Sequence, residues 1–248
     1  MSFIEWLYSS YPNPSTNGQW GSGHIISLVI IAIFIVTSTL LLKNRSLNDK
    51  RIVLVVLASL ILFFELARRG VNFCRTPDQD LLQTLKTLLP RPGCAISCWL
   101  VIIAAFVNKK TVYNVASIVG ILCGLIFFAY PGAGYNNQYI LFENLYSIVT
   151  HCTFFAASIC FVTYGLADFN YRDAWRDLIG IAIVVIYGFL EIAFKIEADP
   201  LFFMPNNEVQ DVVGMSYDVF LPCYIAFIIF YICVYYGIGY LVDRRKKA

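Results

Sequence analysis

The sequence predicts an all-α protein whose helices form a polytopic bundle in a membrane, and three observations support this prediction. Hydrophobic residues make up 59% of the 248 residues and charged residues only 14%, whereas charged residues are about a quarter of an ordinary soluble domain. The apolar residues occur in runs of about 20, the length that crosses a bilayer as a helix. The alternating segments of about 10 residues that form membrane β-barrels are not visible.

We predict seven membrane-spanning helices in a single domain that covers residues 24–242. In chain order the spans are residues 24–42, 52–67, 94–107, 112–130, 142–165, 178–194 and 219–242. The third span is short, unless Leu81 to Leu89 dips into the bilayer ahead of it. Pro131 to Gly134 ends the fourth span, and Pro222 lies near the start of the seventh, where a missing amide costs little.

The two ends of the chain are polar and flank this domain. Residues 1–23 mix Trp and Tyr with Pro, Ser, Asn and Gly, and such aromatic residues favour the membrane interface. We therefore expect residues 1–23 to form an extracellular or interfacial segment. Residues 243–248 form a short basic tail.

The basic residues predict the orientation of the bundle, because cytoplasmic loops of membrane proteins are enriched in Lys and Arg. With the amino terminus outside, 12 of the 18 basic residues face the cytoplasm and the other six face outward. Five of those six lie between the second and third spans. Such a local excess either meets anionic headgroups or is tolerated once the neighbouring spans have fixed the topology.

The composition gives no sign of nucleic acid, metal or cofactor. A net charge of +2 lacks the basic excess of nucleic-acid-binding proteins. The eight cysteines form no CxxC pair, and Cys94 and Cys98 alone do not supply the ligands of a metal site. Membrane lipids are therefore the expected partners, and the sequence indicates no protein partner.

Cys94 is the residue most suited to chemistry. Pro90, Pro92 and Gly93 precede an apolar run, so Cys94 is expected in the first turn of a helix. The exposed amides and positive dipole of a helix start, with Arg91 nearby, favour a thiolate, which is the nucleophilic form. The plainer alternative is that Cys94 is a small apolar packing residue.

Ionisable residues inside membrane spans are costly and are functional candidates by default. With the predicted orientation, these candidates all fall in the outer half of the bundle, whereas the inner halves carry no buried charge. We therefore expect a polar cavity that opens toward the outer leaflet. The candidates with their neighbours at the helix ends are His24, Glu65, Arg68, Arg69, His151, Glu191, Lys195, Asp218 and Tyr224.

Each candidate also has a structural interpretation that the sequence leaves open. His24 could anchor the chain at the membrane interface, and His151 could be held by a neighbouring carbonyl. Glu65 could form a helix ion pair with Arg68 or Arg69, and Glu191 one with Lys195. Tyr224 could be a packing residue.

A cysteine and a histidine within reach of each other suffice for acyl transfer through a thioester. An apolar groove between spans would hold the acyl chain, and the lipid headgroup would face Arg68, Arg69 and Arg91. We therefore predict Cys94 and His151 as catalytic residues and His24, Glu65, Arg68, Arg69, Arg91, Glu191 and Tyr224 as substrate-binding residues.

Short motifs along nearly the whole chain resemble the YwaF-type integral membrane proteins. They are His24 at the mouth of the first span, Leu-Pro-x-x-x-Cys at 89–94, Thr150-His151, Leu-Pro-Cys-Tyr at 221–224 and the segment 199–206. The resemblance implies a relation to eukaryotic transmembrane acyltransferases that remodel ether phospholipids. It also implies that Cys94 is the acyl acceptor and His151 the base.

Three functions remain open: a Cys/His phospholipid acyltransferase or acyl hydrolase of the cell membrane, a substrate-binding or transport component without catalysis, and an assembly partner without a ligand. A transporter usually has broken helices or an internal repeat, and neither is visible. An assembly partner would not need His151 or Glu191 inside its spans.

Overall fold

A computed structural model describes residues 21–75, 80–90, 93–129, 132–135, 142–168, 170–199 and 201–247. Within these ranges all regular secondary structure is helical, which confirms the predicted all-α class. Residues 1–20 of the predicted interfacial segment lie outside the described ranges, as does Arg91.

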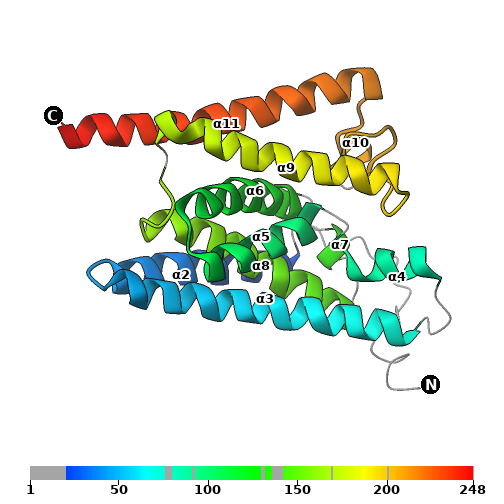
Figure 1. Cartoon of the computed structure of the whole chain (residues 1–248), viewed down its shortest axis with the longest axis horizontal. Coiled ribbons are helices and arrows are strands. Elements are labelled where there is room, and N and C mark those ends of the chain that lie inside the picture. Colours follow the sequence, from blue (N-terminus) through cyan, green and yellow to red (C-terminus); the bar gives the residue numbers. More distant parts are fainter. Residues whose placement is uncertain are drawn as a thin grey trace.

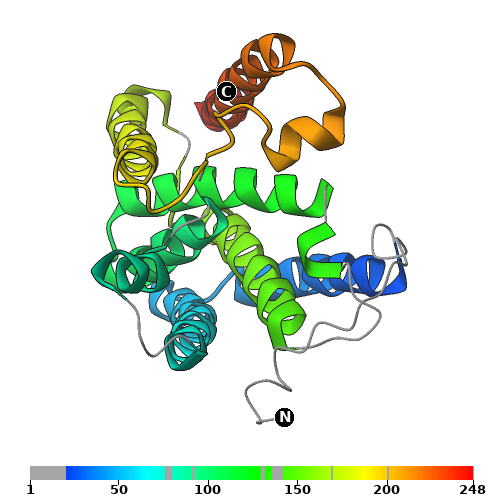
Figure 2. The ribbon, with the colours of Figure 1, turned by 90° about the vertical axis from the view of Figure 1, so that its right-hand side faces the viewer.

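Seven long helices stand where the seven spans are predicted. Helices α3, α9 and α11 lie lengthwise in Figure 1, and α11 runs in the opposite direction to α9, whereas α6 lies across them in Figure 2. Their bounds are α2 (Ser22–Leu42), α3 (Leu47–Arg75), α5 (Gly93–Val107), α6 (Lys110–Ala129), α8 (Phe142–Thr163), α9 (Ala174–Ala193) and α11 (Tyr217–Lys247).

Three of these helices extend four or more residues beyond the predicted span at one end or both. Helix α3 extends beyond residues 52–67 at both ends, and α9 begins four residues earlier than the sixth predicted span. Helix α11 continues through most of the predicted basic tail. Polar residues can extend a helix beyond the bilayer, so hydropathy alone marks the apolar part and not the helix end.

In the described part of the chain, four short helices lie between the long ones. They are α4 (Leu81–Leu88), α7 (Gly132–Tyr135), the 3₁₀ helix η1 (Tyr171–Asp173) and α10 (Glu208–Val213). The segment 81–89, which the sequence placed ahead of the third span, thus forms a helix of its own. Helices α4 and α5 are bent by 62° relative to each other.

By length and composition, four helices in the described part of the chain can cross a membrane. They are α2, α6, residues 144–163 of α8 and residues 217–241 of α11, and α4 with α5 gives a fifth if the bent pair is one span. Helices α3 and α9 carry more charge than a simple span. The chain is therefore a helical membrane protein with several apolar helices, and the count of seven spans and the orientation stay predictions.

Helices α3, α5, α6 and α8 form the centre of the bundle and share its main apolar core. Glycines allow α6 and α8 to approach closely, because a Cβ at Gly120 would collide with Ser158 and one at Gly124 with Phe155. Helices α9 and α11 lie across α6 from α2 and α3 (Figure 2).

Many of the helix ends gather in two groups. The Cys94 end, on the right of Figure 1, contains the start of α5 and α8 and the last turns of α3 and α9. The Lys110 end, on the left, contains the start of α6 and of α9. In the predicted orientation the Cys94 end faces outward.

Candidate functional site

Cys94 lies in the first turn of α5, as predicted. The helix begins at Gly93, and Cys94 is half-buried beside the main apolar core. The Gly93 carbonyl accepts hydrogen bonds from Ser97 Oγ at 3.0 Å and from Cys123 Sγ of α6 at 3.8 Å. The helix start that carries Cys94 is therefore held against α6.

A buried ion pair lies on α3 at the same end of the bundle. Arg69 pairs with the Glu65 carboxylate, and Tyr146 of α8 donates a hydrogen bond to the other carboxylate oxygen. Arg69 Nε also donates to the Leu88 carbonyl at 2.8 Å. Of the two predicted partners of Glu65, the structure therefore selects Arg69, and it adds Tyr146, which the sequence did not indicate.

Besides Nε of Arg68, two donors beside the ion pair have no acceptor among the described residues. They are Nη2 of Arg69, a residue that is only 5% exposed, and Nε1 of Trp99. The Arg69 guanidinium lies 5.4 Å from the centre of the Trp99 ring, so the two donors belong to the same region. Because a buried donor without an acceptor is unfavourable, this region favours a bound oxygen atom.

Arg68 lies beside Tyr146, the residue that donates a hydrogen bond to Glu65. Its guanidinium is 4.9 Å from the centre of the Tyr146 ring, which is a cation–π distance. Arg68 is also close enough to interact electrostatically with His151 and with Cys98, the residue one turn after Cys94. Arg68, which is on the same helix as the ion pair, therefore interacts with residues of α5 and α8, the helices that carry Cys94 and His151.

His151 lies inside α8 with a fixed ring orientation. Its Nδ1 is 2.7 Å from the Ser147 carbonyl, and its ring stacks on Phe127 at 3.7 Å between centroids. A carbonyl can only accept, so this hydrogen bond puts the proton on Nδ1 and the lone pair of the neutral ring on Nε2. The carbonyl contact that the sequence offered as a structural alternative for His151 is therefore present, and it fixes the orientation of the ring.

The His24 side chain is fully buried. Its ring packs at 5.1 Å from Tyr135 and 6.1 Å from Phe128. Phe128 contacts Phe127, which stacks on His151. Both histidines of the chain therefore belong to one aromatic cluster, although they are 127 residues apart in the sequence.

The remaining predicted residues border the Cys94 end from α9 and α11. Glu191 is buried next to Tyr187, and Tyr187 is close enough to Arg69 for an electrostatic interaction. Lys195, by contrast, is exposed beyond the end of α9. Tyr224 is buried, donates to the Leu201 carbonyl at 3.3 Å, and lies within electrostatic range of Cys94.

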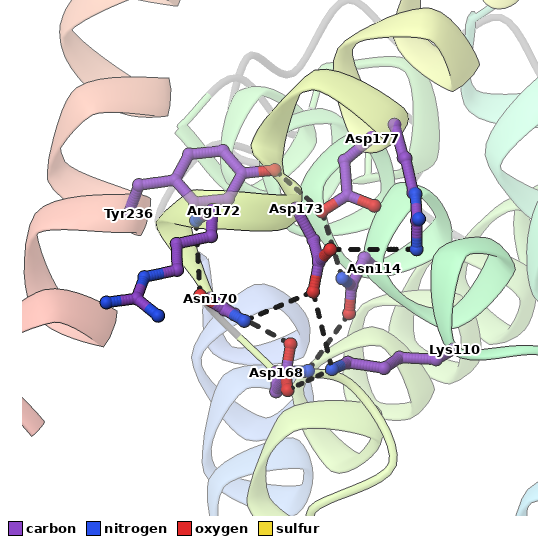
Figure 3. A network of polar contacts seen from close by, with 9 residues as sticks. Lys110, Asn114, Asp168, Asn170, Arg172, Asp173, Asp177 and Tyr236 are labelled. Carbon is purple, nitrogen blue, oxygen red and sulfur yellow. Dashed lines mark hydrogen bonds and ion pairs between the residues drawn. The ribbon is translucent and has the colours of Figure 1, made fainter. Parts of the chain in front are cut away.

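The Lys110 end contains a polar network that sequence reasoning missed (Figure 3). Asp177 is buried, and its Oδ2 accepts hydrogen bonds from Asn114 Nδ2 at 2.9 Å and from the Tyr236 hydroxyl at 2.8 Å. Asn114 Oδ1 accepts from the Asp168 amide at 2.9 Å. This network joins α6, α9, α11 and the loop before α9.

The expectation that the inner halves of the spans carry no buried charge is therefore wrong. Asp177 was placed just outside the sixth span, but α9 begins at Ala174 and packs Asp177 against α6 and α11. Its Oδ1 accepts no hydrogen bond from the described residues. At the surface, Lys110 pairs with Asp168 and lies 3.9 Å from Asp173.

Within the described ranges, no three His, Cys, Asp or Glu side chains gather closely enough to hold a metal ion.

Comparison with known proteins identifies the family. A family model described as the TMEM164 family matches residues 19–240, which include all seven long helices except the last residues of α11. No curated protein and no solved structure matches the chain. The chain therefore belongs to the TMEM164 family of transmembrane proteins.

Proposed function

We propose that this protein is a phospholipid acyltransferase of the cell membrane, related to the YwaF-type proteins, with Cys94 as nucleophile and His151 as base. One observation carries the proposal. A half-buried thiol stands in the first turn of α5, and an imidazole whose proton is fixed on Nδ1 by a carbonyl lies about midway along α8. Helices α5 and α8, which carry the two groups, contact each other.

In the proposed first half-reaction, Nε2 of His151 takes the thiol proton and the Cys94 sulfur attacks the ester carbonyl of a phospholipid. The carbon–oxygen bond to the lipid breaks, and the imidazolium returns its proton to the leaving alkoxide. A thioester on Cys94 and a lysolipid result.

In the second half-reaction, His151 takes the proton of an acceptor hydroxyl, which attacks the thioester carbonyl. The carbon–sulfur bond breaks, the acyl chain passes to the acceptor, and the imidazolium returns its proton to the sulfur. No oxidant, reductant or metal is needed. Water in place of the acceptor lipid would make the same site an acyl hydrolase.

The donors beside the ion pair suit the oxygen atoms of such a lipid. Nη2 of Arg69 and Nε1 of Trp99 are available for a carbonyl or phosphate oxygen, and preorganised donors stabilise the charge that develops on a carbonyl oxygen. We assign headgroup binding to Arg68 and, from the sequence alone, to Arg91. His24 supports His151 through the aromatic cluster, and Glu191 and Tyr224 border the site.

The ion pair also supports a membrane-spanning α3 and hence the seven-span topology. A charge alone at the bilayer centre is expensive, whereas paired charges that face the bundle interior are tolerated. Glu65 and Arg69 are both buried and neutralise each other. With the amino terminus outside, the proposed site faces the outer leaflet.

The test is acyl transfer to the protein itself. Purified protein in detergent is incubated with a phospholipid that carries a labelled acyl chain, and hydroxylamine-labile label on the protein is measured. We expect label on the wild type and on Cys98→Ala, which removes a buried thiol one turn away, and none on Cys94→Ala. Label that persists in Cys94→Ala would contradict the proposal.

Binding without catalysis is the second candidate, and the open donors of Arg69 and Trp99 favour it, because they suit a bound solute or lipid whether or not a reaction follows. In that case the wild type would bind labelled phospholipid without acquiring hydroxylamine-labile label, and Cys94→Ala would bind it equally well.

A further inference from the structure

Asp177 is a buried carboxyl group whose two oxygen atoms have different surroundings. Its Oδ2 accepts hydrogen bonds from Asn114 of α6 and Tyr236 of α11, whereas its Oδ1 has no hydrogen-bond partner among the described residues. The residue is only 1% exposed, so the bare oxygen is closed off from bulk water. Both of the donors that reach Oδ2 are neutral side chains. The surrounding helices therefore supply hydrogen bonds to Asp177 but no positive charge.

The cations nearest in the network are paired with other acids (Figure 3). Lys110 pairs with Asp168 and lies 3.9 Å from Asp173. Arg176 lies 3.6 Å from the other carboxylate oxygen of Asp173. The side chains of these four residues are between 33% and 57% exposed, so they form a solvated ion cluster beside the buried Asp177. Within the described part of the chain, no Lys, Arg or His forms an ion pair with Asp177.

A negative charge on Asp177 would therefore be buried without a counter-ion. Such a charge is far more costly in a protein interior than the neutral carboxyl group that forms when a proton binds. Asp168 and Asp173 lie within electrostatic range and would repel a second negative charge. A metal ion does not replace the missing cation, because no three metal-binding side chains of the described ranges gather closely enough to hold one.

We propose that Asp177 is a proton-binding site and that it is a neutral carboxylic acid in the folded protein at neutral pH. The hydrogen bonds assign the position of the proton. Because Oδ2 already accepts from two donors and Oδ1 from none, the proton lies on Oδ1. A buried hydroxyl without an acceptor is much less unfavourable than a buried charge without a counter-ion.

This proton lies where three helices meet. Tyr236 of α11 donates to Asp177 of α9, and Tyr231 of α11 donates to the Ile118 carbonyl of α6 at 2.9 Å. When Asp177 is neutral, the folded protein holds one proton more than the unfolded chain, in which an aspartate is ionised at neutral pH. The free energy of unfolding therefore falls as the pH rises, until Asp177 ionises. Alkaline pH thus weakens the attachment of α11 to α6 and α9.

Infrared spectroscopy tests the proposal on the full-length protein in phosphatidylcholine vesicles. A protonated carboxyl group has a carbonyl stretching band that a carboxylate lacks, and the difference spectrum between wild type and Asp177→Asn isolates the band of this residue. We expect Asp177→Asn to lose such a band at neutral pH. The control Asp168→Asn, which removes a half-exposed acid that is paired with Lys110, should lose none. In the wild type, the band should disappear at alkaline pH.

The free energy of unfolding gives a second measurement. Asparagine has the shape of a neutral carboxylic acid, with its amide nitrogen in place of the protonated oxygen. Asp177→Asn should therefore be as stable as the wild type at neutral pH and should not share its loss of stability at alkaline pH.

Two outcomes would overturn the proposal. One is the absence of a lost carbonyl band in Asp177→Asn, because a water molecule or a cation at Oδ1 would leave the carboxyl group ionised. The other is a wild-type carbonyl band that is unchanged at every pH at which the protein stays folded, together with equal pH profiles of stability for wild type and Asp177→Asn. Neither measurement depends on catalysis, and both can be repeated in the Cys94→Ala background, so failure here is distinct from failure of the acyltransferase test.

Discussion

The two ends of the bundle bury similar carboxylates in different surroundings. At the Cys94 end, Glu65 accepts a hydrogen bond from Tyr146, and at the Lys110 end, Asp177 accepts one from Tyr236. Glu65 is neutralised by an arginine, whereas Asp177 is held by the neutral amide of Asn114.

The groups left open beside the two carboxylates differ in polarity. Near Glu65, donors of Arg68, Arg69 and Trp99 have no acceptor among the described residues, whereas beside Tyr236 the open group is an acceptor, Oδ1 of Asp177. The surroundings of Glu65 are therefore suited to a carbonyl or phosphate oxygen, and the open oxygen of Asp177 is suited to a donor. The same pair of side-chain types, a carboxylate and a tyrosine, supports a candidate site at one end and joins three helices at the other.

The strongest test of this contrast is the replacement of His151 by Phe. Phenylalanine keeps the stacking on Phe127 but cannot accept a proton, so the rate of acyl labelling should fall by about 10²- to 10⁴-fold. The measurement is the time course of hydroxylamine-labile label on the protein. Asp177→Asn at the other end is the control and should label at the wild-type rate. A wild-type rate in His151→Phe would remove the imidazole from the mechanism.

Glu65→Leu should cause the largest loss of stability. Removing one partner of a buried pair leaves the other charge uncompensated, at a cost of about 3–5 kcal/mol in the free energy of unfolding. Denaturant unfolding in mixed micelles measures this loss. The double variant Glu65→Leu/Arg69→Met should recover most of it, because an apolar pair can replace a buried ion pair. Equal losses in the single and double variants would show that pairing is not the cause.

A matched pair of tyrosine variants sharpens the comparison. Tyr146→Phe and Tyr236→Phe each remove one hydrogen bond to a buried carboxylate, so each should lower the free energy of unfolding by about 1.5–3 kcal/mol. Only Tyr146→Phe should also slow acyl labelling, because it releases the Glu65–Arg69 pair. If Tyr236→Phe slowed labelling equally, the assignment of different roles to the two ends would be wrong.

The smallest effect is expected for Lys110→Met. The ion pair of Lys110 with Asp168 is about half-exposed on both sides, and such pairs contribute about 0–1 kcal/mol. The midpoint of unfolding should therefore hardly change, and acyl labelling should not change. A loss as large as that of Tyr236→Phe would mean that the surface pair, and not the buried Asp177, holds the Lys110 end together.

Much of the fold could be predicted from local features of the sequence. Apolar runs located all seven long helices, and the Pro-Gly segment before Cys94 located the start of α5 to within a residue. The helix ends were less accurate where polar residues continue a helix, as at Asp177. That inaccuracy hid the network at the Lys110 end.

The candidate site was only partly predictable. The spacing along the helix allowed Glu65 to pair with either Arg68 or Arg69 and did not distinguish between the two. It gave no sign of Tyr146, which lies 81 residues from Glu65 in the sequence. Nor could it show that His24 and His151 share an aromatic cluster. The aromatic residues that connect the two histidines come from segments that are far from them in the sequence.

The sequence by itself determined that this is a helical membrane protein, where its long helices lie, and that Cys94 begins a helix, because hydropathy and Pro-Gly breaks act locally along the chain. Only the tertiary structure decided which charges pair, which donors remain open and how the His151 ring is oriented. These properties depend on the packing of α3, α5, α6 and α8 against one another, and side-chain contacts between helices leave no regular spacing in a single sequence.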